Sequence, residues 1–413
     1  MTLERDSRVH SAHDARRPPC VAIVGAGIVG LAHAWAAASR GWRVLLFERS
    51  PRACGASIRN FGMVWPIAQP TGPAHRCALK SRKLWLELLH ETRAWSTPCG
   101  SLHLAYRDDE LAVLEEFARL APSLGVECEL LSAEGVVRRS AAAQVDHLLG
   151  GLWSATELTI DPREVVARMP QWLHQTLGVE LRFNTSIESV ASRRVRSSHG
   201  SQWTVDRVVV ATGSDFHAIY PDLYADADIR LCKLQMLRTV PQPGGWKLGP
   251  MLAGGLTLRH YESFRVCPSL EALKRRIAAE TPELDRYGIH VMASQNGRGE
   301  VVLGDSHEYG EDITPFDKAC IDELILRELR RMLVLPDWAI QERWHGLYAK
   351  TTGAFPFFAE PEPNIHVHVA PGGAGMTMSF GVAETQWESW CGPRHTQQVG
   401  KRDGEPIPAA APL

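Results

Sequence analysis

The segment that most constrains the fold is "CVAIVGAGIVGLAHAWAAASRGWRVLLFERS", residues 20–50. Its first apolar run, 21–24, is typical of a strand buried in a parallel sheet. An Ala-rich helical pattern over 28–39 and a second apolar strand over 43–47 follow. A GxGxxG pattern joins the first strand to the helix, at Gly25, Gly27 and Gly30. Together these features predict a βαβ unit whose glycines let the backbone approach a pyrophosphate closely.

An acidic residue, Glu48, stands at the end of the second predicted strand, 18 residues beyond Gly30. A carboxylate at this place accepts hydrogen bonds from the ribose hydroxyls of a dinucleotide. The N-terminus of the intervening helix offers free N–H groups and a positive dipole end to the phosphates. The whole unit therefore predicts a dinucleotide site.

Further glycine turns follow strand patterns at 211–213 and 372–375, far along the chain from the turn at 25–30. A nicotinamide enzyme typically needs one such fingerprint, whereas a flavin is contacted at both of its ends. We therefore expect FAD as the cofactor. The alternative class, an NAD-linked dehydrogenase, stays open from these residues alone.

Residues 229–334 differ from their surroundings, because alternating segments and helical patterns there suggest an antiparallel sheet with helices. We predict an α/β fold, a Rossmann-like FAD-binding domain with an inserted antiparallel-sheet substrate domain. Within it "LTLRHYESF", residues 256–264, is expected to be a strand. The predicted parts are an FAD-binding domain over 20–95, 150–228 and 335–391, a substrate domain over 96–149 and 229–334, and flexible tails over 1–19 and 392–413.

Composition argues against several other classes of protein. The chain has 45 basic and 47 acidic residues, so its charge directs it neither to nucleic acid nor to an anionic membrane. The nine cysteines form no CxxC pair, so we expect no metal site. The N-terminus lacks an apolar secretory segment, and no apolar run of about 18 residues exists. A cytoplasmic protein without a membrane span is therefore expected.

Five segments carry a resemblance to a known family: "GAGIVG", Glu48, "GASIRNFGMVWP", "VVVATG" and "APGGAGMTMSFG". Together they resemble the D-amino-acid-oxidase-like flavoproteins, which include glycine oxidase and monomeric sarcosine oxidase. The resemblance covers residues 20–391. "ASIRNFGMVWP" and "HGLYA" are similar to a subgroup associated with bacterial phosphonate catabolism, known for oxidising 2-aminoethylphosphonate and its N-methyl form.

The resemblance implies a set of residues that contact FAD from several parts of the chain. It assigns the pyrophosphate to the three glycines of the first turn and the adenosine end to Glu48 and Arg49. The expected contacts to the flavin ring and ribityl chain are Ser57, Asn60, Gly62, Met63, Ala211, Thr212, Gly213, Gly373, Ala374, Gly375, Met376 and Thr377. The last of these bring a helix N-terminus to the flavin ring, where its dipole would stabilise negative charge.

The segment "ERWHGLYAKTT", residues 342–352, corresponds to a strand that passes the flavin in this family. Sarcosine oxidases carry there a cysteine bonded to FAD; this chain has Gly346, so non-covalent FAD is expected. Glycine oxidases carry an arginine that binds the substrate carboxylate; this chain has Tyr348. The further candidates for substrate contact are Lys350, Arg259, Tyr261 and Arg59.

The implied activity is oxidation of 2-aminoethylphosphonate or its N-methyl form to phosphonoacetaldehyde, with release of ammonia or methylamine. The expected partners are a small anionic amine and O2 or another electron acceptor. A glycine- or sarcosine-type oxidase acting on a carboxylate is the main alternative. A flavoprotein subunit that works only within a larger complex is another.

Overall fold

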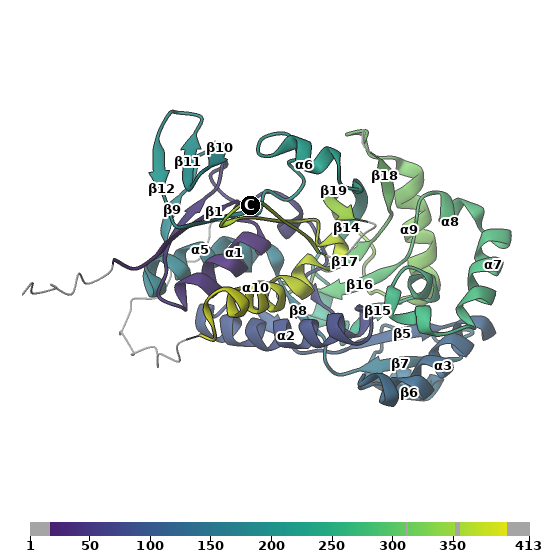
Figure 1. The fold of residues 1–413 in the computed structure, drawn as a ribbon. Coiled ribbons are helices and arrows are strands. Elements are labelled where there is room, and N and C mark those ends of the chain that lie inside the picture. The colour runs from purple at the N-terminus through teal and green to yellow at the C-terminus, as the bar shows by residue number, and fades with distance from the viewer. Residues whose placement is uncertain (1–16, 311–312, 352–355, 395–413) are drawn as a thin grey trace, which may run out of the picture.

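The computed structural model describes residues 17–310, 313–351 and 356–394. Most of the two predicted tails, 1–19 and 392–413, therefore lies outside the described residues. Two sheets lie side by side, with the N-terminal and C-terminal elements around the first and the central green elements around the second (Figure 1). No described helix is both long and apolar enough to cross a bilayer.

The first sheet has six strands in the order β20-β21-β13-β1-β2-β9, and all its pairs are parallel except β20 with β21. It confirms the predicted dinucleotide-binding fold. Its strands are β1 (Cys20–Val24), β2 (Arg43–Phe47), β9 (Glu180–Arg182), β13 (Arg207–Val210), β20 (Phe357–Glu362) and β21 (Ile365–Val369).

Four helices cover one face of this sheet, where Ile23, Leu46 and Val209 meet a buried apolar cluster. They are α1 (Ile28–Ala38), α2 (Pro73–Thr92), α5 (Pro162–Leu177) and α10 (Gly375–Cys391). The opposite face packs against α6 (Pro221–Ala225) and a small sheet of β10 (Ile187–Ala191), β11 (Arg194–Ser197) and β12 (Gln202–Thr204). The parallel strands are apolar on both faces because both are covered.

The second sheet has nine strands in the order β18-β14-β17-β16-β15-β5-β7-β6, and β19 also pairs with β14. Its pairs are antiparallel except β5 with β15, which confirms the predicted antiparallel substrate-binding sheet. Its strands are β5 (Ser101–Ala105), β6 (Glu129–Ser132), β7 (Gly150–Ser154), β14 (Ile229–Thr239), β15 (Met251–Ala253), β16 (Met292–Gln295), β17 (Val301–Gly304), β18 (Glu308–Gly310) and β19 (Ile340–Thr351).

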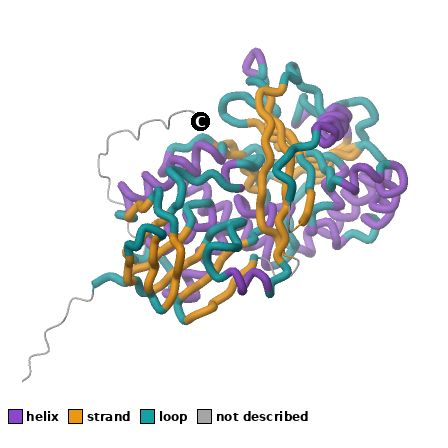
Figure 2. Tube along the Cα trace, turned by 90° about the horizontal axis from the view of Figure 1, so that it is seen from above, coloured by secondary structure: helices purple, strands orange, loops and turns teal. Residues whose placement is uncertain are grey.

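Helices and a second three-stranded sheet complete the molecule, and Figure 2 shows helices beside the large sheet and strands running between the two halves. The small sheet has the order β3-β8-β4. The remaining bounds are β3 (Met63–Val64), β4 (Ser96–Thr97), β8 (Leu158–Ile160), α3 (Asp108–Leu124), α4 (Ala133–Arg139), α7 (Leu270–Glu280), α8 (Pro282–Arg286) and α9 (Ala319–Met332).

Two features differ from the sequence-based expectation. The strands β7 and β19 belong to the nine-stranded sheet, although the expected domain boundaries group them with the FAD-binding part. The segment 256–264, expected to be a strand, lies mostly in the short 3₁₀ helices Gly255–Arg259 and Glu262–Val266. Leu258, Tyr261 and Phe264 are spaced by three residues, which suits the 3₁₀ period of about three residues per turn.

The helices α10 and α2 pack closely because Gly381 lies against the backbone of α2. A Cβ atom at position 381 would lie 2.3 Å from the carbonyl oxygen of Cys77. A side chain there would push apart two helices that both cover the parallel sheet.

We therefore expect Gly381→Ala to lower the free energy of unfolding by about 1–3 kcal/mol, the usual cost of overpacking a core. The control is Gly375→Ala on the same helix, where the added Cβ would meet Pro371 at an ordinary 3.4 Å. Urea unfolding of both variants measures the difference. Equal stabilities of the two variants would contradict the close packing.

Candidate active site

One cavity of about 870 Å³ runs between the two sheets, from the β1–α1 turn to the strands β14 and β19. Its dinucleotide end is lined by Gly27, Glu48 and Ser57, and its far end by Tyr348 and Lys350. A cavity of this size suits a large organic ligand. Most of the residues expected at the cofactor and substrate therefore line one continuous space.

The first glycine turn has little room for side chains. Gly25 has φ +107°, and a Cβ there would lie 2.3 Å from the carbonyl oxygen of Ala211. A Cβ on Gly30 would lie 1.8 Å from the carbonyl oxygen of Gly25. Gly30 does not itself line the cavity. Its role is the close packing of α1 against the strand, so a direct pyrophosphate contact is expected only from the first two glycines.

Glu48 is held at the end of β2 by two backbone N–H groups. Ala26 N donates to Oε2 at 3.1 Å, and Ser50 N donates to Oε1 at 3.0 Å. Each carboxylate oxygen keeps a second lone pair. The half-buried Glu48 can therefore still accept hydrogen bonds from ribose hydroxyls in the cavity. Arg49 beside it pairs with Asp215 at 2.7 Å and is mostly exposed.

The segment after β2 turns back over the cavity through side-chain hydrogen bonds of its own. Ser57 Oγ accepts the N–H of Ile28 at 2.9 Å, at the start of α1. Asn60 donates to two carbonyl groups of its own loop and accepts the N–H of Gly62. Gly62 has φ +72°, and a Cβ there would lie 2.1 Å from Ile160 O. Gly62 does not line the cavity, so its expected flavin contact is corrected to a role in backbone packing.

The N-terminus of α10 also lines the cavity, together with the glycine turn before it. A Cβ on Gly373 would lie 3.6 Å from the hydroxyl of Tyr348. Thr377 Oγ1 accepts the N–H of Trp65 at 2.9 Å and so fixes the segment that follows Asn60 and Met63. The residues expected near the ribityl chain and flavin ring that line this part are Met63, Ala211, Thr212, Gly213, Gly346, Gly373, Ala374, Gly375, Met376 and Thr377.

At the far end, the pairing of β14 with β19 sets which side chains face the cavity. Tyr348 lies opposite Cys232, and Gly346 lies opposite Leu234. Lys350 Nζ lies 3.3 Å from the hydroxyl of Tyr309. Burial raises the pKa of Tyr348 well above its usual value, so this hydroxyl stays protonated and can donate a hydrogen bond.

Tyr261 and Arg59 also reach the cavity, whereas Arg259 does not. Burial raises the pKa of the Tyr261 hydroxyl, which donates to Met292 Sδ at 3.3 Å. Arg59 Nη1 lies 3.5 Å from the carbonyl oxygen of His345. The guanidinium of Arg259 pairs with Asp285 and donates to two carbonyl groups. The expected substrate contact of Arg259 is therefore corrected to a structural ion pair.

Sequence reasoning missed several residues at the far end of the cavity. His290, Asp305 and His307 line it beside His260. They follow or precede short strands, and no motif marks them. The pairing of β16 with β17 brings His290 and Asp305 together. Only a correct strand register would have pointed to them.

The residues present fit FAD on structural grounds. The turn at Gly25 and Gly27 opens to the cavity at the N-terminus of α1, and Glu48 supplies acceptors for a ribose. A second helix N-terminus, that of α10, lies further along the same cavity. The site thus offers separate positions for a pyrophosphate, a ribose and an electron-rich ring.

We expect Glu48→Ala to weaken FAD binding by about 10- to 100-fold, because hydrogen bonds to a charged group contribute ~1.5–3 kcal/mol. Titration of the FAD-free protein by flavin fluorescence measures the dissociation constant. Glu180→Ala is the control, since Glu180 lies on the neighbouring strand β9, pairs with Arg43 and does not line the cavity. Unchanged affinity in Glu48→Ala would contradict the assignment.

Comparison with curated proteins finds relatives of part of the chain. The tRNA 5-methylaminomethyl-2-thiouridine biosynthesis bifunctional protein MnmC of Burkholderia mallei is 30% identical over 266 residues, with 57% of this chain and 38% of that protein covered. The protein from Burkholderia pseudomallei matches to the same extent. The chain therefore spans well under half the length of these relatives.

Comparison with solved structures finds the same fold. Glycine oxidase from Bacillus cereus superimposes with a TM-score of 0.72 and 15% identity, covering 90% of this chain and 94% of that one. L-proline dehydrogenase from P. horikoshii gives a TM-score of 0.72 and 20% identity, covering 92% and 96%. At these identities the likeness supports the fold alone.

The sequence profile of one family, described as "FAD dependent oxidoreductase" (DAO), matches residues 20–385. This range contains both sheets and the whole described cavity. It also decides between the two cofactors left open above, in favour of FAD. The chain belongs to the DAO family of FAD-dependent oxidoreductases.

Proposed function

We propose that this protein oxidises a small anionic amine, 2-aminoethylphosphonate or its N-methyl form, to phosphonoacetaldehyde. The observation that carries the proposal is the placement of Tyr348 and Lys350 on β19, where both line the cavity beyond the N-terminus of α10. This end combines a cation with protonated phenols, which suits an oxyanion. Ammonia or methylamine would be the second product.

A phosphonate needs several donors because it has three acceptor oxygens and up to two negative charges. Lys350 supplies a positive charge, and the hydroxyl of Tyr309 lies 3.3 Å from it. The hydroxyl of Tyr348 adds a donor that burial keeps protonated. A charge-assisted hydrogen bond together with neutral donors is a common way to hold such a group.

The resemblance supports a phosphonate over a carboxylate. Glycine oxidases place an arginine, which binds a carboxylate through two parallel hydrogen bonds, where this chain has Tyr348. A tyrosine offers one donor and no charge. A carboxylate would thus lose the two parallel hydrogen bonds of the arginine, whereas the more highly charged phosphonate can bind Lys350.

The chain's own residues would orient the substrate and adjust its charge. The positive charge of Lys350 would favour the neutral form of a nearby amine, whose lone pair is needed for oxidation. Bound FAD would supply the acceptor for the hydride on the carbon next to nitrogen, with O2, giving H2O2, or another acceptor as the final oxidant. The amine nitrogen loses a proton, and water hydrolyses the resulting imine to the aldehyde and the free amine.

The alternative substrate class is a glycine- or sarcosine-type amino acid, and one observation favours it. Arg59 lines the cavity, and its Nη1 lies a long 3.5 Å from the carbonyl oxygen of His345. It could turn toward a carboxylate. A direct comparison of substrates separates the two classes.

The test is anaerobic mixing of the pure, FAD-loaded chain with 2-aminoethylphosphonate, its N-methyl form, glycine and sarcosine. We expect the phosphonates to bleach the flavin fastest at equal concentration. Faster bleaching by glycine or sarcosine would overturn the phosphonate assignment. Peroxide release in air would identify O2 as the acceptor, and turnover by the isolated chain would exclude a subunit active only within a complex.

We expect Lys350→Met to raise the KM for the phosphonate by about 10- to 100-fold, since a charged hydrogen bond of ~1.5–3 kcal/mol is lost. The effect on glycine should be smaller, because its anion carries less charge. Lys274→Met is the matched control, since Lys274 pairs with Glu271 on the exposed face of α7. Equal losses for glycine and phosphonate would argue against selection by charge.

The bound FAD is expected to be non-covalent. Gly346 stands where sarcosine oxidases carry the linking cysteine, and Cys54, the cysteine among the described residues that line the cavity, lies at the dinucleotide end. Acid precipitation should therefore release all FAD into the supernatant, where mass spectrometry identifies it. Yellow colour retained in the washed precipitate would contradict this expectation.

A further inference from the structure

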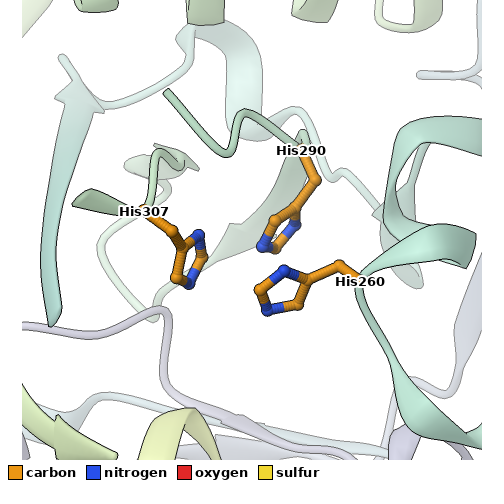
Figure 3. A group of neighbouring side chains, drawn as sticks. All are labelled: His260, His290 and His307. Carbon is orange, nitrogen blue, oxygen red and sulfur yellow. The ribbon is translucent and has the colours of Figure 1, made fainter. Parts of the chain in front are cut away.

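Three histidines from separate segments meet at the far end of the cavity (Figure 3). His260 lies between two 3₁₀ helices, His290 precedes β16, and His307 follows β17. The three rings face a common space, and one nitrogen of each lies within 4.8 Å of the other two. Histidines at this spacing can share one ligand.

The backbone around the cluster is firmly held. His290 and Asp305 exchange two backbone hydrogen bonds, of 3.2 and 2.8 Å, and the N–H of His307 donates to Tyr287 O at 2.8 Å. Arg259 fixes the turn before His260, because its guanidinium donates to Ile289 O and pairs with Asp285. The imidazoles are thus positioned by paired strands and an anchored turn.

Two members of this region, His290 and Asp305, lack the hydrogen bonds that burial normally requires. His290 is 1% exposed, and its Nδ1 has no hydrogen-bond partner. Its Nε2 lies 3.2 Å from Oδ1 of Asp305, which is 4% exposed, but this contact does not have hydrogen-bond geometry. Each unsatisfied buried polar group costs about 1–3 kcal/mol. The arrangement is therefore expensive for a core and fits a site whose ligand satisfies these atoms.

The hydrogen bond of His307 shows which of its ring nitrogens is available to a ligand. His307 Nδ1 lies 3.3 Å from Gly288 O, where it donates, so its Nε2 carries the lone pair. That lone pair can coordinate a metal ion.

We propose that His260, His290 and His307 bind one divalent transition-metal ion of the Zn²⁺, Co²⁺ or Ni²⁺ type. Neutral imidazole is a preferred ligand of these ions. Asp305 Oδ1 lies 3.2 Å from His290 Nε2 and places a carboxylate beside the ion. This carboxylate would offset part of the positive charge that the ion brings near Lys350 and Arg259.

Three protein ligands leave a coordination position open, and it faces the cavity. A substrate oxygen can occupy such a position. The ion would then hold the phosphonate group together with Lys350 and Tyr348, and this consequence rests on the function proposed above. The metal site itself does not depend on it.

The experiment uses the tag-free, FAD-loaded chain, treated with a chelator, dialysed and titrated with Zn²⁺ and, separately, Co²⁺. We expect one ion per chain by elemental analysis, a dissociation constant in the micromolar range or below, and a raised Tm, since binding to the folded state stabilises it. Less than a tenth of an ion per chain, with no change in Tm, would overturn the proposal.

Variants locate the ion. His260→Ala should weaken metal binding at least tenfold, and this partly exposed position should tolerate the change, which the flavin spectrum checks. His345→Ala is the control, because His345 pairs with Asp317 and does not line the cavity. Asp305→Asn should weaken binding less than His260→Ala does. Wild-type affinity in His260→Ala would overturn the proposal.

The two proposals fail separately. Metal binding is measured without substrate, and amine oxidation is measured on the same preparation with and without the ion. Metal uptake without phosphonate oxidation would support the metal site and overturn the proposed function. Phosphonate oxidation by a chain that takes up no metal would leave the function and remove the site.

Discussion

The backbone contact between the first glycine turn and its neighbours determines where everything else in the site can lie. Gly25 lies against Ala211, and Gly30 lies against Gly25, at distances that admit no Cβ atom. This packing brings β13 beside β1 and starts α1 directly at the cavity. The N-terminal N–H groups of α1 and the carboxylate of Glu48 therefore border the same cavity. A dinucleotide site follows from sterics before any side-chain chemistry is considered.

The long pairing of β14 with β19 has the same importance for the other half of the cavity. Eleven residue pairs extend from Ile229 opposite Thr351 to Thr239 opposite Ile340. Because the strand period is two, this register turns Gly346 and Tyr348 toward the cavity and keeps them there. The wall of the substrate end is thus a sheet, not a loop, and a sheet holds charged and phenolic groups at fixed separations.

The sequence predicted the parts of the fold that depend on local pattern. Glycine spacing and apolar runs predicted the strands β1 and β2 and the helix α1. They also predicted that Glu48 lies next to the glycine turn. Gly62, however, faces Ile160 instead of the cavity, and Arg259 turns to Asp285. Those outcomes depend on contacts between distant segments, which periodicity does not encode.

The histidines show why such contacts matter for chemistry. His290 and His307 stand at the ends of short strands and have no motif, yet strand pairing places them beside His260 and leaves His290 Nδ1 without a hydrogen-bond partner. A buried imidazole without a partner is costly, so an apolar residue would stabilise the fold better at position 290. A ligand such as the ion proposed above would offset that cost. Tyr348 and Lys350 close the same pocket, so its polar character belongs to whatever it binds.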